Sequence, residues 1–253
     1  MKPTAEHPFT HRRSDGHTLR GRYLPGDGDL LVFLPGFRSV HTGLKAQAFS
    51  ALASRHGHGC LRFDYLGHGD SDGAFETFRL SEAITDAGDC IHQVLRPGQR
   101  LHLVGSSMGG WIALELARHG SATPQSMMLI APAVDFVSRR LALMPQTART
   151  ALKRDGFVTM ADDYAPGTDY RILQNFLDDA LALEPGEGAL TVPCPVRIVH
   201  GSDDDSVPLA TSKRLVRQLP CATLLSVAGG DHRLSEHLDL LLNECAVLLG
   251  LTP

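Results

Sequence analysis

Residues 101–111, LHLVGSSMGGW, give the strongest indication of the fold class of this chain. This stretch begins with an apolar, strand-like run, and the segment after its two serines has helical spacing. The letters GSSMG match the pattern G-x-S-x-G with Ser107 at its centre, a pattern that places a serine on a sharp strand-to-helix turn. Gly105 and Gly109 suit such a turn because the backbone packs too closely there for larger side chains. We predict that Ser107 is a nucleophile and that Ser106 faces away from the substrate.

A bare match to this pattern also occurs at ordinary helix starts, where the serine only caps the helix. A serine hydroxyl is a poor nucleophile near neutral pH, and it needs an adjacent base that is itself oriented by a carboxylate. In hydrolases with this motif the chain order is Ser, then Asp or Glu, then His. The role of Ser107 therefore depends on whether an acid and a base follow it in the chain.

Short apolar runs alternate with helical stretches along most of the sequence. We predict strands at 60–65, 101–106, 126–133, 196–201 and 222–229, and helices at 43–57, 80–95, 108–120, 209–219 and 234–250. Two earlier runs, 19–26 and 30–36, are joined by Gly-Asp-Gly-Asp and are predicted to form an antiparallel hairpin. This alternation predicts an α/β fold, with a mostly parallel sheet of about eight strands and helices on both faces.

The segment 134–192 interrupts the alternation. It contains amphipathic pieces punctuated by prolines, and it has no clear strand. Because it is longer than a connection between two strands needs, we predict that it forms a small helical cap over the carboxyl ends of the strands. The core domain would then comprise residues 1–133 and 193–253. The alternative is an ordinary pair of crossover helices.

The composition argues against several function classes. Hydrophobic residues make up 43% of the chain and charged residues 21%, with a net charge of -4, so nothing points to a nucleic-acid partner. No apolar run approaches the roughly 20 residues of a membrane span, and the start of the chain lacks the apolar core of a secretory signal. The five cysteines are scattered without C-x-x-C spacing, which predicts a reduced, cytoplasmic protein without a disulfide framework.

Candidates for the base and the acid follow the last two predicted strands, in the required chain order. His232 lies in AGGDHRLSE after the final strand, and we predict that it is the base. The loop after the preceding strand carries three consecutive candidates for the acid, Asp203, Asp204 and Asp205. Both loops fall at strand carboxyl ends, where open α/β sheets bind their ligands. Asp135 is a more distant fourth candidate for the acid.

Stabilising the transition state requires backbone N–H groups aimed at the developing oxyanion. The N–H of Met108 lies at the predicted helix start directly after the nucleophile. The N–H of Phe37 follows Gly36, which allows a close approach in the loop after strand 30–36. We predict that these two groups form an oxyanion hole. No pair of the remaining histidines has ligand-like spacing with a carboxylate, so we expect no metal site and no organic cofactor.

Five stretches taken together resemble one family: LPGFRSVHTGLKA, RFDYLGHGDSDG, GSSMGGW, CPVRIVHGSDDDSVP and GGDHRLSE. They are similar to stretches of serine hydrolases of the α/β-hydrolase superfamily. Within it, they resemble the mitochondrial acyl-protein thioesterases that also cleave acyl glucuronides, and their bacterial relatives. The resemblance implies the α/β-hydrolase fold. It also implies that Asp204 is the acid, because the family pattern H-G-x-x-D-x-x-V-P falls on residues 200–208.

The resemblance further implies hydrolysis of carboxylic esters or thioesters through an acyl-enzyme on Ser107. The substrate would be a small-molecule ester or thioester, or an acylated protein. We expect some apolar side chains of the cap either to line an acyl pocket or to pack the cap against the sheet: Phe136, Leu141, Met144, Phe157 and Phe176. A non-catalytic ligand-binding module and a peptidase or C–C bond hydrolase with the same triad remain alternatives. With no evident transit peptide, we expect no mitochondrial address.

Overall fold

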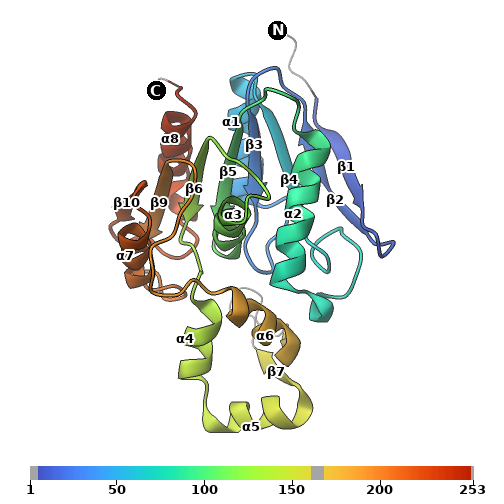
Figure 1. The fold of residues 1–253 in the computed structure, drawn as a ribbon, viewed down its shortest axis with the longest axis vertical. Helices are drawn as coiled ribbons and strands as arrows, with labels where there is room; N and C mark the ends of the chain where they lie inside the picture. The colour runs from blue at the N-terminus through green and yellow to red at the C-terminus, as the bar shows by residue number, and fades with distance from the viewer. Residues whose placement is uncertain (1–4, 161–167, 252–253) are drawn as a thin grey trace.

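Within residues 5–160 and 168–251, which the computed structural model describes, eight strands form one sheet in the order β1-β2-β4-β3-β5-β6-β9-β10 (Figure 1). The strands from β4 onward along this order run parallel to one another. The predicted sheet of about eight mostly parallel strands is therefore confirmed. The strand bounds are β1 (His7–Arg12), β2 (Thr18–Leu24), β3 (Leu30–Leu34), β4 (Gly59–Phe63), β5 (Leu101–Ser106), β6 (Ser126–Ile130), β9 (Val196–Gly201) and β10 (Ala222–Val227).

The predicted hairpin between 19–26 and 30–36 is wrong. All five residues of β3 are buried, and its two edges pair in parallel with β4 and β5. A strand that is apolar on both faces belongs in the middle of a parallel sheet, which removes it from the sheet edge. Strand β2 pairs instead with β4 and with β1, a strand that was not predicted. The real hairpin is β1–β2, and its turn uses Gly16 at a φ of 92°.

Helices cover both faces of the sheet (Figure 1). Apolar side chains of α1 (Leu44–Arg55) and α8 (Leu238–Leu248) pack on one face. Those of α2 (Leu80–Val94), α3 (Met108–Arg118) and α7 (Leu209–Gln218) pack on the other. In α2 the buried residues follow the helical period, which gives it one continuous apolar stripe. This burial, about 1.5–3 kcal/mol for a large apolar side chain, holds the strand ends in place.

Between β6 and β9 the chain leaves the sheet and forms a separate body beyond α3 and the end of β6, as Figure 1 shows. Its elements are α4 (Phe136–Leu143), α5 (Gln146–Asp155), β7 (Phe157–Met160), β8 (Tyr170–Leu173) and α6 (Gln174–Leu183). The expectation of a strand-free segment is wrong, because β7 and β8 pair antiparallel. Val158 and Ile172 face each other in this pair and are buried. Four-residue strands are too short to show a clear period in the sequence.

None of the helices within the described ranges has the length and apolar character needed to cross a membrane.

Candidate active site

Ser107 lies at the turn between β5 and α3 with a strained backbone. Its φ of 55° and ψ of -116° are outside the conformations that side-chain-bearing residues normally adopt. Close backbone packing at Gly105 and at Gly109 maintains this strained conformation. A Cβ on Gly105 would lie 2.2 Å from the carbonyl oxygen of Gly109, and a Cβ on Gly109 would lie 2.0 Å from that of Leu34. The N–H of Ser107 donates to the carbonyl of Ile130 at 2.8 Å, which ties the turn to β6.

Ser107, His232 and Asp204 form a continuous hydrogen-bonded chain. The Oγ of Ser107 lies 3.0 Å from Nε2 of His232, and Nδ1 of His232 lies 2.7 Å from Oδ2 of Asp204. Because the carboxylate only accepts, Nδ1 carries the proton and Nε2 is free to accept from the serine hydroxyl. The structure thus brings together the three side chains that the sequence singled out, from positions 125 and 28 residues apart.

The loops that carry His232 and Asp204 cross each other closely. A Cβ on Gly201, at the end of β9, would lie 2.1 Å from the carbonyl oxygen of Gly230. Lys45, at the start of α1, donates from Nζ to the carbonyl of Arg233 at 2.6 Å. Burial, with a smaller contribution from the charge of Arg233, lowers the pKa of Lys45 to about 8. Lys45 was not among the residues predicted from the sequence, because no local pattern links it to a loop 188 residues away.

Asp204 is surrounded by donors. Its Oδ1 accepts from the backbone N–H groups of Ser206 and Val207 at 2.8 and 2.7 Å. Its Oδ2 lies 2.7 Å from Nδ1 of His232 and 3.1 Å from Nε2 of His200. Burial raises the pKa of the Asp204 carboxyl, but hydrogen bonds from His200 and His232 outweigh it, so the pKa lies well below its usual value. The surrounding donors therefore favour the ionised form of the Asp204 carboxyl group.

The other candidate acids point elsewhere. Asp203 and Asp205 are exposed, and Asp203 accepts from the hydroxyl of Ser202 at 2.7 Å. Asp135 accepts from the hydroxyl of Thr211 at 2.7 Å and from Arg214 at 3.2 Å, which links the start of α4 to α7. These contacts leave Asp204 as the carboxylate paired with His232 among the four.

The two predicted oxyanion donors both lie near Ser107, because Met108 follows it in the chain and the loop that carries Phe37 approaches it in space. A Cβ on Gly36 would lie 3.3 Å from the Cβ of Ser107, so the loop after β3 passes directly beside this serine. Met108 is the first residue of α3, where N–H groups have no partner within the helix. Within residues 5–160 and 168–251, no hydrogen bond takes up the N–H of Phe37 or of Met108. Both groups are available to a ligand oxygen.

Residues 31–243 match the model of the alpha/beta hydrolase family. The chain belongs to that family. Human mitochondrial palmitoyl-protein thioesterase ABHD10 is 30% identical over 230 residues, which cover 90% of this chain and 74% of that protein. A putative hydrolase from Agrobacterium vitis S4 superposes with a TM-score of 0.89 at 31% identity, over 98% of this chain and 100% of that chain. Mouse alpha/beta hydrolase domain-containing protein 10 gives a TM-score of 0.87 at 27% identity, covering 96% and 98% of the respective chains. The predicted resemblance is confirmed.

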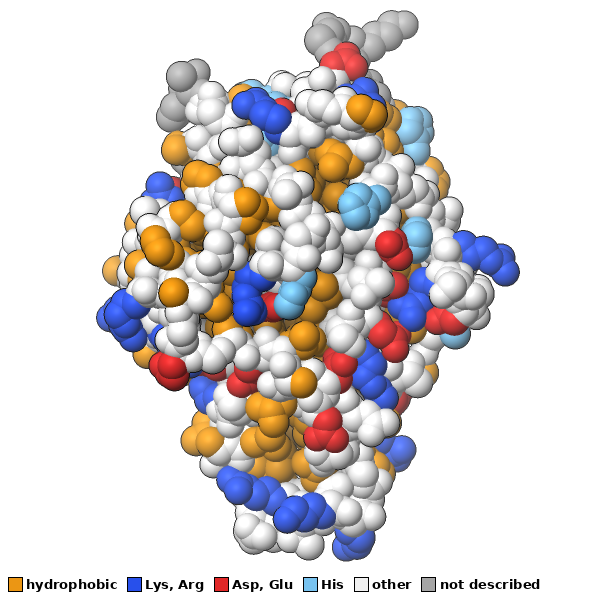
Figure 2. Space-filling model, in the orientation of Figure 1, with side chains coloured by type: hydrophobic (Ala, Val, Ile, Leu, Met, Phe, Trp, Pro, Cys, Tyr) orange, Lys and Arg blue, Asp and Glu red, His pale blue; other side chains and the backbone are white. Residues whose placement is uncertain are grey.

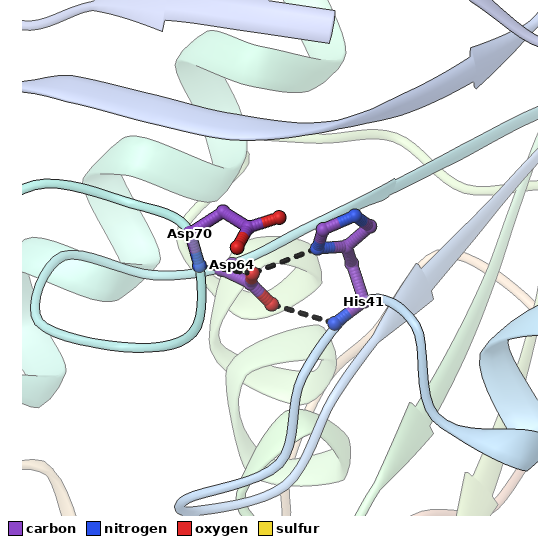
Figure 3. Close-up of side chains that lie close together, drawn as sticks. All are labelled: His41, Asp64 and Asp70. Atoms are coloured by element: carbon purple, nitrogen blue, oxygen red, sulfur yellow. Dashed lines mark hydrogen bonds and ion pairs between the residues drawn. The ribbon is translucent and has the colours of Figure 1, made fainter. Parts of the chain in front are cut away.

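In this alpha/beta hydrolase a buried His–Asp pair braces the loop that carries Phe37. Asp64 accepts from the backbone N–H of His41 at 2.6 Å and from its Nδ1 at 2.7 Å, as Figure 3 shows. Its Oδ2 also accepts from the N–H of Asp70 at 2.9 Å. The ligand atoms of His41, Asp64 and Asp70 lie within 4.8 Å of one another, close enough to surround a cation. Since both oxygens of Asp64 are already hydrogen-bonded, we interpret the cluster as a structural brace.

Two of the five apolar side chains expected in a pocket, Phe136 and Phe176, contact the ring of Phe37 at 6.0 and 5.5 Å, next to the candidate oxyanion donor. Leu141 and Met144 pack in the same apolar cluster as these two rings, a cluster that the insertion shares with one face of the sheet. The ring of Phe157 lies beneath the guanidinium of Arg171 at 4.6 Å. Figure 2 shows further apolar side chains gathered on the visible face of the insertion, with Lys and Arg side chains along its far end.

Proposed function

We propose that this protein is a serine hydrolase that cleaves carboxylic esters or thioesters, with Ser107 as nucleophile, His232 as base and Asp204 as the orienting acid. The observation that carries the proposal is the hydrogen-bonded chain from Ser107 through His232 to Asp204, with contacts of 3.0 and 2.7 Å. The chain ends on a serine held in a strained turn. Membership of the alpha/beta hydrolase family supports the same chemistry.

In the first step, the Oγ of Ser107 attacks the acyl carbonyl carbon while its proton passes to Nε2 of His232. Asp204 keeps the Nδ1–H tautomer in place and stabilises the imidazolium that forms. The carbonyl oxygen becomes an oxyanion that accepts from the N–H groups of Phe37 and Met108. Each such donor typically lowers the barrier by roughly 3 kcal/mol.

In the second half of the first step, the C–O or C–S bond breaks and His232 returns the proton to the leaving alcohol or thiol. This leaves the acyl group esterified to Ser107. A water molecule then attacks the same carbonyl and gives its proton to His232. Collapse of the second tetrahedral intermediate releases the carboxylic acid and restores the serine hydroxyl. Every proton in the cycle is moved by residues of this chain.

The proposed substrates are acyl esters and thioesters, including acylated proteins. The curated relatives that support this choice are named palmitoyl-protein thioesterases. We propose that residues 134–192 act as a cap that selects the acyl group, with Phe136 and Phe176 nearest the candidate oxyanion donor. We propose a cytoplasmic location, and the free thiols of all five cysteines are compatible with any reducing compartment. The relatives are named as mitochondrial proteins, and our proposal does not transfer that location to this protein.

The test combines active-site labelling with a substrate profile. A fluorophosphonate probe should label the wild type and the Ser106→Ala variant but not Ser107→Ala. The same three proteins should then be assayed on p-nitrophenyl esters from acetate to palmitate and on the matching acyl thioesters. A rate peak at long chains, on thioesters above esters, supports a depalmitoylating enzyme, whereas a peak at acetate contradicts that substrate. A folded protein that is neither labelled nor active would favour the ligand-binding alternative.

A further inference from the structure

The ring of Phe37 stands at the centre of an aromatic cluster drawn from two parts of the molecule. On the core side its ring centroid lies 5.2 Å from that of Phe75, 6.3 Å from Phe78 and 6.2 Å from His68. On the insertion side it contacts rings from three separate elements, those of Phe136 in α4, Tyr170 in β8 and Phe176 in α6, at 6.0, 6.1 and 5.5 Å. All six ring pairs fall in the range in which aromatic contacts are favourable.

The next residue makes the same bridge. Arg38 has a φ of 58°, in the left-handed region that residues with a side chain rarely adopt. Its guanidinium lies 5.6 Å from the ring centroid of Phe75, in the core, and 4.3 Å from that of Tyr170, in the insertion. Two consecutive residues directly after Gly36 are therefore each held between the core and the insertion.

The core side of this arrangement is anchored independently. Tyr65 donates from its hydroxyl to the carbonyl of Pro35 at 3.2 Å, one residue before Gly36. Phe78 and His68 are almost fully buried, with 3% and 4% of their surface exposed. Downstream, His41 is bound by Asp64. Residues 37 and 38 lie between the anchored residues Pro35 and His41. Half of the aromatic rings that their side chains contact belong to the insertion.

We propose that Phe136, Tyr170 and Phe176 are positioning residues for the oxyanion hole, because they hold the ring, and through it the backbone N–H, of Phe37. The inference rests on the proposed function. An insertion that only covered the acyl group would need no contact with residue 37. Here three of its aromatic rings, those of Phe136, Tyr170 and Phe176, contact Phe37, and Tyr170 also lies under the guanidinium of Arg38. Packing of the insertion against the core then also places the N–H of Phe37 in the oxyanion hole.

The test uses p-nitrophenyl acetate, whose two-carbon acyl group is too short to need an acyl pocket in the insertion. Phe176→Leu removes the stacked ring, at 5.5 Å and 27° to Phe37. We expect kcat on acetate to fall about tenfold with KM changed less than about twofold, because a small displacement of an oxyanion donor weakens only the transition state. Tyr170→Leu should act in the same direction, and the ring-retaining Tyr170→Phe should restore most of the rate.

Phe49→Leu is the matched control. Phe49 stacks on Phe33 at 5.6 Å and 22°, nearly the geometry of the Phe37–Phe176 pair, but it lies in the apolar cluster on the other face of the sheet. It should lower the melting temperature by an amount similar to Phe176→Leu and leave kcat on acetate near wild type. A loss of kcat that merely follows the loss of stability in both variants would overturn the proposal.

A second measurement does not depend on activity. The amide of Ser39 donates to the carbonyl of Gly36 at 3.0 Å and so reports on the order of this loop. Its hydrogen exchange should be about tenfold faster in Phe176→Leu than in the wild type, and unchanged in Phe49→Leu. Unchanged exchange in Phe176→Leu would overturn the proposal even if the rate fell. Failure of the wild type to hydrolyse any ester or thioester would instead refute the proposed function, and the exchange result would still decide whether the insertion positions Phe37.

Discussion

The imidazole of His200 lies 3.1 Å from Oδ2 of Asp204, the same carboxylate oxygen that lies 2.7 Å from Nδ1 of His232. Nε2 of His200 also lies 2.9 Å from the carbonyl of Val207, so its two neighbours are both acceptors and Nε2 carries the proton. Nδ1 then accepts from the hydroxyl of Ser212 at 2.6 Å. A histidine outside the predicted triad is thus a fully partnered support for the proposed acid.

His200→Leu removes this support and leaves an apolar side chain against a buried carboxylate. We expect the free energy of unfolding to fall by about 2 kcal/mol, the usual result of leaving a buried polar group unpaired. We also expect kcat to fall about tenfold, because Asp204 loses one of the groups that orient it toward His232. His56→Leu, in the exposed turn after α1, is the control and should change neither urea denaturation nor hydrolysis. Unchanged kcat in His200→Leu would limit His200 to a role in folding.

The three consecutive aspartates offer a test with built-in controls. Asp204→Asn should lower kcat by about 10⁴-fold, because an amide favours the wrong tautomer of the paired histidine. Asp203→Asn and Asp205→Asn should keep at least half of the wild-type rate, since both side chains are exposed. Steady-state hydrolysis of one ester by all four proteins makes the comparison. A large loss in either control would point to a different acid.

The strained turn makes Ser107 a site where activity and stability should change in opposite directions. Ser107→Gly removes the hydroxyl and also suits the observed φ of 55°. It should abolish hydrolysis and raise the free energy of unfolding by about 1 kcal/mol, within the range expected for relief of backbone strain. Ser107→Ala should be equally inactive without this gain, since alanine keeps the strain. Equal stability of the two variants in urea would argue that the turn stores no strain.

Protonation of Asp204 should contribute to acid denaturation. Burial raises its pKa, but the hydrogen bonds from His200 and His232 lower it further, so the folded-state pKa lies below the ordinary value of 3.8. The native state then binds the proton less tightly than the unfolded chain. The resulting stabilisation is complete above about pH 5 and is lost as the pH falls through the ordinary pKa of 3.8 toward the lowered one. A tenfold difference in proton affinity between the two states is worth about 1.4 kcal/mol of stability.

Urea denaturation of the wild type and Asp204→Asn between pH 2.5 and 7 tests this assignment. The difference in their free energies of unfolding should stay constant from pH 7 to about pH 5 and shrink steadily below pH 4. A difference that is the same at pH 3 and pH 6 would contradict a lowered pKa at this carboxyl.

Gly109→Ala should be among the most destabilising single-methyl additions in the molecule. The new Cβ would lie 2.0 Å from the carbonyl oxygen of Leu34 and 2.6 Å from that of Pro35, and these backbone atoms cannot move aside as a flexible side chain could. We expect a loss of about 3 kcal/mol or more, the upper range for overpacking. Gly188→Ala, where a Cβ meets nothing within 4 Å, should be neutral. Thermal melts of the two variants make the comparison, and a stable, active Gly109→Ala would disprove the close packing at the turn.

Local sequence patterns predicted a large part of the fold and of the candidate site. The spacing of Gly105, Ser107 and Gly109 predicted a sharp turn after a buried strand, because only glycine tolerates backbone at that distance. Alternating strands and helices predicted a parallel sheet, and chain order then placed the acid and the base after later strands. Spacing could not choose among Asp203, Asp204 and Asp205, since three adjacent residues of one loop share the same local signal. That choice required the resemblance to a family.

Features that depend on neighbours along the chain could be predicted before the fold was known. They are the strand and helix periods, the G-x-S-x-G turn, and the chain order of Ser107, the aspartates 203–205 and His232. Three other features became visible in the folded chain: the strands beside β2, the contact of His200 with Asp204, and the rings from both the core and the insertion around Phe37. The two sets of features depend on interactions of different range. Turn and helix preferences act over a few residues, whereas strand pairing, ring packing and a shared carboxylate oxygen join segments that meet only after the chain has folded.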